Sequence, residues 1–334
     1  MKLLLWGRDE KQEKKGETKM RKLISIIMIV TLIAVVFIAC ARKPTKIRIG
    51  YLAITNSLPL YTAVEKGFFK NRSIHAELIK FQTSNDLVEA LIAERLDIEI
   101  SASTAVLYAM ELRSPGEFKI FSANIQTKEK FPDYIIVRKD SDISKIEDLK
   151  GRKLGTFPGS TFMIIIRLIL EKFIDPDQVT IEQIPPPAQV EALGSGRVDA
   201  IYTLDPFCIL ALEKANGKIL ESAPAEKYVL DPLPGGAAAF SSSFVKKNPK
   251  IAKKIVQAFD EAIEFIRTNE TQAREYLTKY TPLKPDIARK INIVYFWKSE
   301  EIDPIPIQKY ADILYAEGGL KGKVDAEKLI FKLK

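Results

Sequence analysis

Histidine and cysteine are scarce in this chain of 334 residues, which contains one His and two Cys. His75 is expected in a turn between a helix and a strand, and no Cys, Asp or Glu cluster at metal-ligand spacing lies beside it in the sequence. A nucleophile activated by histidine would have to use this residue, and nothing in the pattern places a Ser or Cys near it. We therefore expect no metal, no cofactor and no catalytic residue.

The chain also lacks the glycine-rich loops that bind nucleotides. The stretch GTFPGST (155–161) has neither the Lys nor the four-residue gap of a phosphate-binding G-x-x-x-x-G-K-[ST] loop, and no G-x-G-x-x-G follows a strand. The net charge of +8 does not indicate nucleic-acid binding, because residues 1–39 carry half of it and no dense Lys/Arg patch is interleaved with aromatics. A mild basic bias suits a protein held near an anionic membrane surface.

An almost continuous apolar run lies near the N-terminus. It extends from Leu23 to Ala39 after a basic start at Met20, and it ends in a small residue followed by Cys40. This is the pattern of a secretory signal peptide, and the ending FIAC resembles a bacterial lipobox, in which the Cys is lipidated after cleavage. An uncleaved membrane anchor is the alternative, because the run approaches spanning length. Both interpretations place the body outside the cytoplasm, and we favour the lipoprotein.

This interpretation divides the N-terminal extension and leaves one cysteine in the body. Residues 1–39 are the predicted signal peptide and residues 40–45 a lipidated tether. The charged stretch Met1–Lys19 fits neither a signal peptide nor a folded element, so it is a candidate start-site artefact. With Cys40 lipidated, Cys208 has no cysteine partner and is expected to be a buried thiol in an apolar setting.

Beyond the tether, strand-like and helix-like segments alternate in two series, 46–124 and 133–203. The β-α-β-α-β order predicts an α/β fold in which each series forms a mostly parallel sheet flanked by helices. Within the second series, residues 160–173 are apolar almost all round, which favours a buried helix over a long strand. Toward the C-terminus helices predominate, with elements expected at 248–269, Thr271–Lys279, Pro285–Trp297 and Ile305–Glu317.

Two stretches share six letters at identical offsets: VEALIAERLDIEI (88–100) and VEALGSGRVDAIY (190–202). Each is expected to be a helix, a tight turn and a strand, so the repetition predicts two lobes of similar construction, although αβ units can share this pattern by chance. The predicted lobes are residues 46–138 with 238–334 and residues 139–237, joined by two hinge crossings near Val137–Ser141 and Pro234–Ala239.

Small polar residues follow the predicted strands in both series. In a parallel sheet these positions share the carboxyl edge, where ligands bind, and helix N-termini there attract anions. Helix capping alone could explain any one of them, but their recurrence in both lobes predicts a ligand cleft. The loops contain no Arg or Lys, so a bound anion would be held by dipoles and hydroxyls, or the ligand is largely neutral. They are Ile54–Pro59, Gln82–Asn85, Ser101–Thr104, Thr156–Thr161 and Thr203–Pro206.

Several segments together resemble substrate-binding proteins of ABC transporters, in the nitrate, sulfonate and taurine class that includes binders of thiamine pyrimidine precursors. The resemblance covers Ile47 to Ile266 and implies a two-lobe periplasmic-binding-protein fold (type II) that closes over a small ligand. Glu99 departs from it, because Gly is common at that position. The segments that carry it, beside the lipobox, are GYLAITNSLPLYTAVEKGFFKNRSI, LVEALIAERLDIEIS, IEDLKGRKLGTFPGST, VEALGSGRVDAIYTLDPF and AAAFSSSFVKKNPKIAKKIVQAFDEAI.

The resemblance also implies ligand-binding residues, and no position matches the cationic clamp of the nitrate binders. If Asp205 faces the cleft, an amine-bearing ligand such as taurine or an aminopyrimidine is favoured; if it caps a turn, it says nothing about the ligand. The implied residues are Asn56, Ser57, Thr83, Ser84, Ser103, Thr104, Gly159, Ser160, Thr161 and Asp205.

The function implied is that of a monomeric, extracytoplasmic lipoprotein, in the periplasm or on the cell surface, anchored to the membrane through Cys40. It would deliver a small organic solute to an ABC permease and its ATPase, without binding nucleic acid. One alternative is an enzyme on the same scaffold, such as a pyrimidine synthase or a chorismate-type dehydratase, against which the leader and the scarcity of His and Cys speak. Another is a ligand-sensing partner of a membrane protein, which the sequence does not separate from a transport component.

Overall fold

The computed structural model describes residues 45–332, so the predicted signal peptide, the lipidated Cys40 and the tether up to Pro44 lie outside the described residues, whereas Thr45 is the first residue of a strand. Contacts divide the chain into two units, Met1–Thr45 and Lys46–Lys334. The buried apolar residues of the described part all lie between Ile47 and Leu329, so the second unit has a hydrophobic core of its own. Within 45–332, no helix has both the length and the apolar character needed to cross a membrane.

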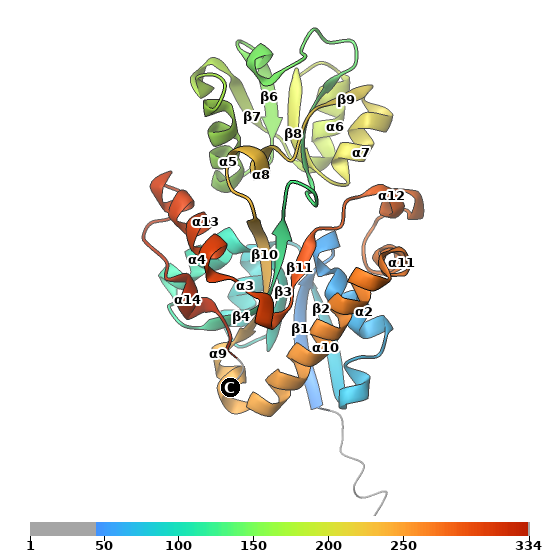
Figure 1. Cartoon of the computed structure of the whole chain (residues 1–334), viewed down its shortest axis with the longest axis vertical. Coiled ribbons are helices and arrows are strands. Elements are labelled where there is room, and N and C mark those ends of the chain that lie inside the picture. Colours follow the sequence, from blue (N-terminus) through green and yellow to red (C-terminus); the bar gives the residue numbers. More distant parts are fainter. Residues whose placement is uncertain (1–44, 333–334) are drawn as a thin grey trace, which may run out of the picture. The chain divides into compact units, whose positions relative to one another are not determined.

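The first sheet of the body has six strands in the order β11-β4-β10-β3-β1-β2 (Figure 1). β1 and β3 are parallel, whereas β10 is antiparallel to both β3 and β4, and β11 is antiparallel to β4. The sheet is therefore mixed, and not mostly parallel as predicted. Its strands are β1 Thr45–Leu52, β2 Ile74–Phe81, β3 Ile98–Ser103, β4 Phe118–Gln126, β10 Leu233–Ser241 and β11 Tyr295–Trp297.

The second sheet has five strands in the order β7-β6-β8-β5-β9, and it is mixed as well. β6 is parallel to β7 and β8, whereas β5 lies antiparallel between β8 and β9. The two sheets thus repeat one order, because β2-β1-β3-β10-β4 corresponds position by position to β7-β6-β8-β5-β9. The strands are β5 Asp133–Arg138, β6 Lys153–Thr156, β7 Thr180–Gln183, β8 Ala200–Leu204 and β9 Gly217–Ser222.

β5 and β10 decide where the chain crosses between the sheets. β5 pairs only with strands of the second sheet, so the first crossing is 127–132 and precedes the predicted one at Val137–Ser141. β10 lies wholly in the first sheet, so the second crossing is 229–232, ahead of the predicted Pro234–Ala239. Both strands are apolar and buried on both faces, as expected for inner strands, and this pattern does not reveal which sheet receives them.

The repeated stretches form the same unit twice, α3 followed by β3 and α6 followed by β8. The repeated Asp precedes the strand in each unit and binds the neighbouring strand. The backbone N–H of Arg48 donates to Asp97 Oδ2 at 2.8 Å, and that of Lys153 donates to Asp199 Oδ2 at 2.8 Å. In the first sheet the Asp therefore joins β3 to β1, and in the second sheet the matching Asp joins β8 to β6.

Helices flank both sheets, and α5 is a helix, as favoured over a strand, with Ile165, Ile166, Ile169 and Leu170 buried. The helix predicted over Pro285–Trp297 stops at Lys290, because the β-branched and aromatic end of that segment forms β11 on β4. The helices are α2 Leu58–Glu65, α3 Ser84–Ile92, α4 Thr104–Arg113, α5 Ser160–Glu171, α6 Pro186–Gly194, α7 Phe207–Lys214, α8 Pro224–Tyr228, α9 Ser242–Lys247, α10 Pro249–Thr268, α11 Glu270–Tyr280, α12 Pro285–Lys290, α13 Pro304–Ala316 and α14 Ala326–Leu329.

Candidate functional site

A cavity of about 580 Å³ lies between the two sheets, and both sheets contribute to its walls. Leu52 and Ser103 come from the ends of β1 and β3, and Tyr202 and Leu204 come from β8. A third wall is apolar and comes from α13 and the turn after it, with Tyr310, Leu314 and Leu320 as its main side chains. The cavity has the volume range of sites that enclose a small organic molecule.

Three α-helix N-termini and one 3-10 turn meet at this cavity. Asn56 belongs to the short 3-10 turn Thr55–Ser57 that leads into α2, Ser84 is the first residue of α3, and Ser103 is the N-cap of α4. From the second sheet, Gly159 is the N-cap of α5, and the first residues of that helix also line the cavity. The first-turn N–H groups of a helix have no partner within the helix and carry its positive dipole end. The polar side of the cavity can therefore bind an anion without a cationic side chain.

The lining that is described contains no Asp, Glu, Lys, Arg, His or Cys side chain. Its polar groups are hydroxyls, amides and backbone N–H groups. Because an unpaired charge is expensive to bury, this lining suits either a neutral molecule or a small anionic group held by several helix ends.

The structure brings six of the ten implied ligand residues together around this cavity. They come from four loops that are separated by up to about a hundred residues in the sequence. The six are Asn56, Ser84, Ser103, Gly159, Ser160 and Thr161.

Three of the other implied residues bind the backbone instead of lining the cavity. Ser57 is fully buried, and its hydroxyl donates to the carbonyl of Leu52 at 2.7 Å. Thr83 caps α3 by accepting the N–H of Asp86, and the buried Thr104 hydroxyl donates to the carbonyl of Pro234. These three hydroxyls hold the loops that carry the cavity residues.

Asp205 also lies outside the cavity lining. Its Oδ2 accepts the backbone N–H of Asn292 at 2.8 Å, so it fastens the second sheet to the segment after α12. Burial raises the pKa of the Asp205 carboxyl to about 7, and the bond from Asn292 acts in the opposite direction. Since Asp205 caps a backbone N–H and does not face the cavity, it gives no support for an amine-bearing ligand.

Several cavity residues were not predicted. Asn85 and Ser101 belong to the polar loops that the sequence predicts at the cavity, so the same strand-end argument could have included them. Tyr202 follows from no motif, and neither does the apolar wall of Tyr310 and Leu314, because only the tertiary fold brings α13 to the strand ends.

Glu99 is a buried carboxyl beneath this site. β3 bulges where its pairing with β10 shifts register, and Ser101 there has a φ of 72°. Glu99 Oε2 accepts the N–H of Ala102 at 3.0 Å, which gives a partner to a buried donor at the bulge. Burial raises the pKa of the Glu99 carboxyl to about 8. The Glu99 carboxyl therefore stabilises the bulge that carries Ser101.

A second buried carboxyl pair lies beside the crossings. Asp133 begins β5 directly after the first crossing, and Glu226 lies in α8 just before the second. Asp133 Oδ2 accepts from the hydroxyl of Tyr202 at 3.2 Å and from the N–H of Ala225 at 3.0 Å. Burial raises the pKa of both carboxyls, and the charge of Asp133 raises that of Glu226 further. A proton on one carboxyl allows the pair to hydrogen-bond.

A larger hollow of about 780 Å³ lies elsewhere, between α6 and α7. It is lined by Pro187, Phe207 and Lys214, among others, and by none of the implied ligand residues. The cavity between the sheets is therefore the candidate site.

Comparison with known proteins gives one matching family and several relatives that bind small solutes. A model of the NMT1-like family matches residues 41–280. The taurine-binding periplasmic protein of Escherichia coli is 26% identical over 234 residues, which cover 69% of each chain. The nitrate/nitrite binding protein NrtA of Nostoc is 27% identical over 255 residues, which cover 66% of this chain and 53% of that protein.

Solved structures share the fold. The periplasmic aliphatic sulphonate binding protein SsuA from Escherichia coli superposes with a TM-score of 0.71 at 19% identity, covering 86% of this chain and 92% of that chain. The desulfurization enzyme DSZB superposes with a TM-score of 0.65 at 14% identity, covering 86% of this chain and 96% of that chain. At these identities the likeness shows the fold alone, which binding proteins and an enzyme have in common.

The family match spans more than half of the chain, and the predicted resemblance to this class of binding proteins is confirmed. The chain belongs to the NMT1-like family, as an ABC substrate-binding protein related to nitrate, sulfonate and taurine binders.

Proposed function

We propose that the protein is an extracytoplasmic lipoprotein, anchored through Cys40, that binds a small organic solute and delivers it to an ABC permease and its ATPase. The observation that carries the proposal is the cavity between the two sheets, where the N-termini of α3, α4 and α5 meet and no charged side chain is found among the described lining residues. The protein binds its solute without converting it, because this lining offers no acid, base or nucleophile beyond hydroxyls.

The cavity favours a solute with two unlike ends. One side offers N–H groups and hydroxyls from α3, α4 and α5, which suit a sulfonate or another small anionic head. The opposite side is the apolar wall of Tyr310, Leu314 and Leu320, which suits an alkyl or aromatic body. Nitrate has no apolar body, and the ammonium of taurine would meet no carboxylate among the described lining residues. Within the class, we therefore place organic sulfonates ahead of nitrate, taurine and the pyrimidines.

Binding would be coupled to closure about the crossings 127–132 and 229–232. A solute that contacts both lobes stabilises the closed form by the contacts that only this form makes. Tyr202 can report such closure, because its ring lines the cavity while its hydroxyl binds Asp133 at the first crossing.

Thermal unfolding of the protein from Ala41 to Lys334 tests the proposal, with a panel of alkanesulfonates, an aromatic sulfonate, taurine, nitrate and aminopyrimidines. A solute at a hundredfold over its Kd adds about 2.7 kcal/mol to the free energy of unfolding, which raises Tm by several degrees. We expect the largest shift with an organic sulfonate. Ser160→Ala, inside the cavity, should reduce the shift, whereas Thr83→Ala, outside it, should lower the basal Tm and leave the shift intact.

A flat response to every solute on the panel would contradict the proposed solute class. Release of a new product during incubation with a bound solute would contradict binding without conversion, and would favour an enzyme on this scaffold.

A further inference from the structure

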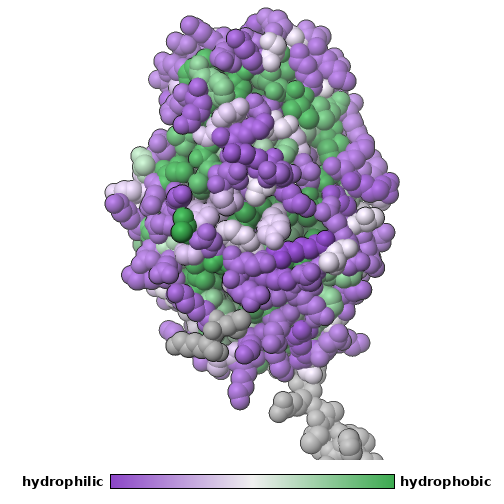
Figure 2. Space-filling view, viewed as in Figure 1, coloured by the Kyte–Doolittle hydropathy of each residue, from purple (hydrophilic) through white to green (hydrophobic). Residues whose placement is uncertain are grey.

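Lysines gather at one end of the body, on α9 and at the start of α10. Lys246, Lys250 and Lys253 are exposed. Lys250 and Lys253 are three residues apart on α10, which makes them neighbours on one helix face, and Lys246 lies in the last turn of α9, before the break at Asn248. Among residues 45–332, no ion pair is formed by these three side chains. Figure 2 shows mostly hydrophilic side chains over α10 in this part of the surface.

The same end contains a basic hollow of about 640 Å³. Its floor is apolar, with Val245, Ile330 and Phe331. Lys119 reaches across it and donates to the carbonyl of Lys328, and the one carboxylate in the described lining is Glu327, which pairs with Lys332. Five lysines share the rim: Lys119, Lys250, Lys253, Lys328 and Lys332.

Like charges held this close repel one another unless an anion lies against them. Neighbouring carboxylates neutralise only part of the charge. Lys247 pairs with Glu94 at 3.2 Å and Lys328 pairs with Asp325 at 3.1 Å, and both pairs are exposed. The lysine face, which we define as Lys246, Lys250 and Lys253, keeps its positive charge and is open to a partner.

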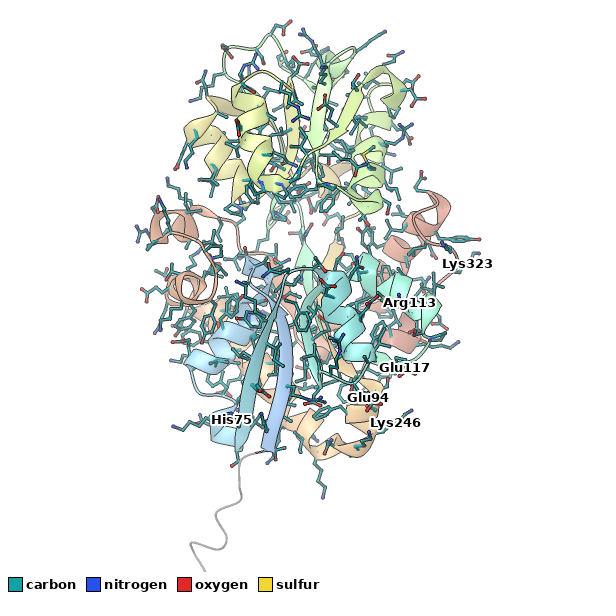
Figure 3. The ribbon with its side chains drawn as sticks, turned by 180° about the vertical axis from the view of Figure 1, so that it is seen from behind. His75, Glu94, Arg113, Glu117, Lys246 and Lys323 are labelled. Atoms are coloured by element: carbon teal, nitrogen blue, oxygen red, sulfur yellow. The ribbon has the colours of Figure 1, made fainter. Side chains whose placement is uncertain are left out.

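The chain enters the body at this same end. β1 begins here (Figure 1), and Lys246 and Glu94 lie toward the same end in Figure 3. Contacts agree with the pictures, because the Glu94 carboxylate that pairs with Lys247 belongs to the residue whose backbone carbonyl accepts from Arg48 of β1 at 2.8 Å. The lysine face is therefore next to the first strand.

Four residues lie between Cys40 and Thr45, where β1 begins, and the five peptide links that join the two residues extend at most about 20 Å. An anchor at Cys40, or in the apolar run Leu23–Ala39, therefore keeps the start of β1 within about 20 Å of the bilayer surface. The connecting sequence adds two more positive charges, Arg42 and Lys43. The face nearest the start of β1 is then within reach of the lipid headgroups.

We propose that the lysine face, together with the basic hollow beside it, binds the anionic phospholipid headgroups of the membrane that carries the N-terminal anchor. This inference rests on the proposed anchoring at the membrane and not on the identity of the solute. Lysine ammonium groups bind phosphate as point charges, and the attraction acts within the Debye length of about 8 Å at physiological salt. The anchor brings the end of the body to the membrane, and the lysines orient it there.

The proposal is tested without the lipid anchor, so that only the surface charge acts. The protein from Ala41 to Lys334, whose core is complete, is sedimented with vesicles of phosphatidylglycerol or of phosphatidylcholine at low salt. We expect binding to the phosphatidylglycerol vesicles alone, and loss of that binding at 0.5 M salt, where the Debye length is about 4 Å. The triple variant Lys246→Glu, Lys250→Glu, Lys253→Glu should bind at least about tenfold more weakly.

A matched control changes the net charge by the same amount on the other lobe. Lys150, Lys172 and Lys214 are also exposed, and no ion pair is formed by them within the described residues. Their triple change to Glu should leave at least half of the vesicle binding. These lysines lie outside the basic hollow and at the ends of elements of the second lobe, which lies opposite the start of β1 (Figure 1).

Equal losses in the two triple variants would overturn the proposal, since they would show a response to net charge alone. No binding to phosphatidylglycerol at low salt, or equal binding to phosphatidylcholine, would overturn it too. Displacement from the vesicles by millimolar glycerol phosphate would instead identify a site for a free phosphate compound, and would also overturn the assignment to lipid. Neither triple variant should change the Tm shift with a solute, so failure here is distinguishable from failure of the proposed transport function.

Discussion

The two sheets share one strand order, and a matched buried position shows how they differ. Gly50 of β1 pairs with Glu99 of β3, and Gly155 of β6 pairs with Ile201 of β8. Ile201 belongs to a fully apolar cluster, whereas Glu99 holds the bulge that carries Ser101. A buried carboxyl is thus accommodated where an irregular strand offers it a free N–H group, and the regular strand takes an aliphatic residue.

The difference extends to the cavity. Ser101 follows Glu99 by two residues and lines the cavity. Thr203 follows Ile201 by two residues, but it is buried and does not line the cavity. β8 pairs regularly with β5, and its neighbours Tyr202 and Leu204 face the cavity instead. One repeated scaffold therefore presents a hydroxyl from the first sheet and larger side chains from the second.

Exchanging the two buried residues should give the largest effect. Ile201→Glu places a carboxyl in an apolar cluster with no bulge to offer a donor, and we expect a loss of about 3 kcal/mol or more in the free energy of unfolding. Glu99→Ile leaves the N–H of Ala102 without its acceptor, with an expected loss of about 1–3 kcal/mol. Urea unfolding of both variants measures the difference, and equal losses would contradict the account of the bulge.

The repeated Asp residues should come next. Asp97 binds the backbone N–H of Arg48 and also its guanidinium, at 2.7 Å, whereas Asp199 binds the backbone N–H of Lys153. We expect Asp97→Ala to lose about 2 kcal/mol and Asp199→Ala about 1 kcal/mol in the same unfolding experiment. A larger loss at Asp199 would show that the two residues do not have matching roles.

A dependence of stability on pH should follow from the buried carboxyl of Glu99. The pKa of Glu99 is about 8 in the folded protein and about 4.3 in an unfolded chain. Between these values the folded state keeps a proton that the unfolded state has released. The free energy of unfolding therefore falls as the pH rises, by up to about 1.4 kcal/mol per unit, and this contribution levels off above pH 8.

Glu99→Gln removes that contribution, so we expect the stability of the variant to fall less steeply than that of the wild type between pH 5 and 8. The other buried carboxyls, Asp133, Asp205 and Glu226, act in the same direction but are common to both proteins. Unfolding by urea at several pH values gives the slopes, with the exposed Glu171→Gln as control. Parallel profiles of wild type and Glu99→Gln would contradict a raised pKa at Glu99.

The smallest effect is expected at the matched hydroxyls. Ser101→Ala should weaken solute binding by about 2- to 10-fold, the value of one hydrogen bond, with little change in Tm. Thr203→Ala should leave the affinity unchanged, because Thr203 does not line the cavity. Calorimetric titration with the solute that stabilises the protein most measures both. An affinity lost equally in the two variants would remove the distinction between the sheets.

Much of the site could be predicted because it depends on local rules. Ligands bind where the strands of a parallel sheet end, and this expectation identified the loops of Ser84, Ser103 and Ser160, which do lie at one cavity. The same rule did not separate Ser103 from Ser57, whose hydroxyl turns back to the carbonyl of Leu52. Which way a hydroxyl points depends on the backbone of its turn, and the residue type does not specify it.

Other features depend on contacts between distant segments. Tyr310 and Leu314 lie about two hundred residues beyond the first-lobe loops that they face, and their helical pattern is that of any core helix. β5 has the apolar character of an inner strand in either sheet, so the crossing was placed too late in the sequence. The three-residue strand β11 is defined mainly by its pairing with β4.

The most direct test of the central claim is whether a side chain that fills the cavity prevents solute binding. Ala109 of α4 lines the cavity and is exposed, so Ala109→Trp can occupy the space with little disturbance of the core, and Ala316→Trp, on α13 and outside the lining, is its matched control. Titration calorimetry with the best organic sulfonate should show one solute bound per chain for the wild type and for Ala316→Trp, and none for Ala109→Trp. Equal affinity of the two Trp variants would show that the solute binds elsewhere.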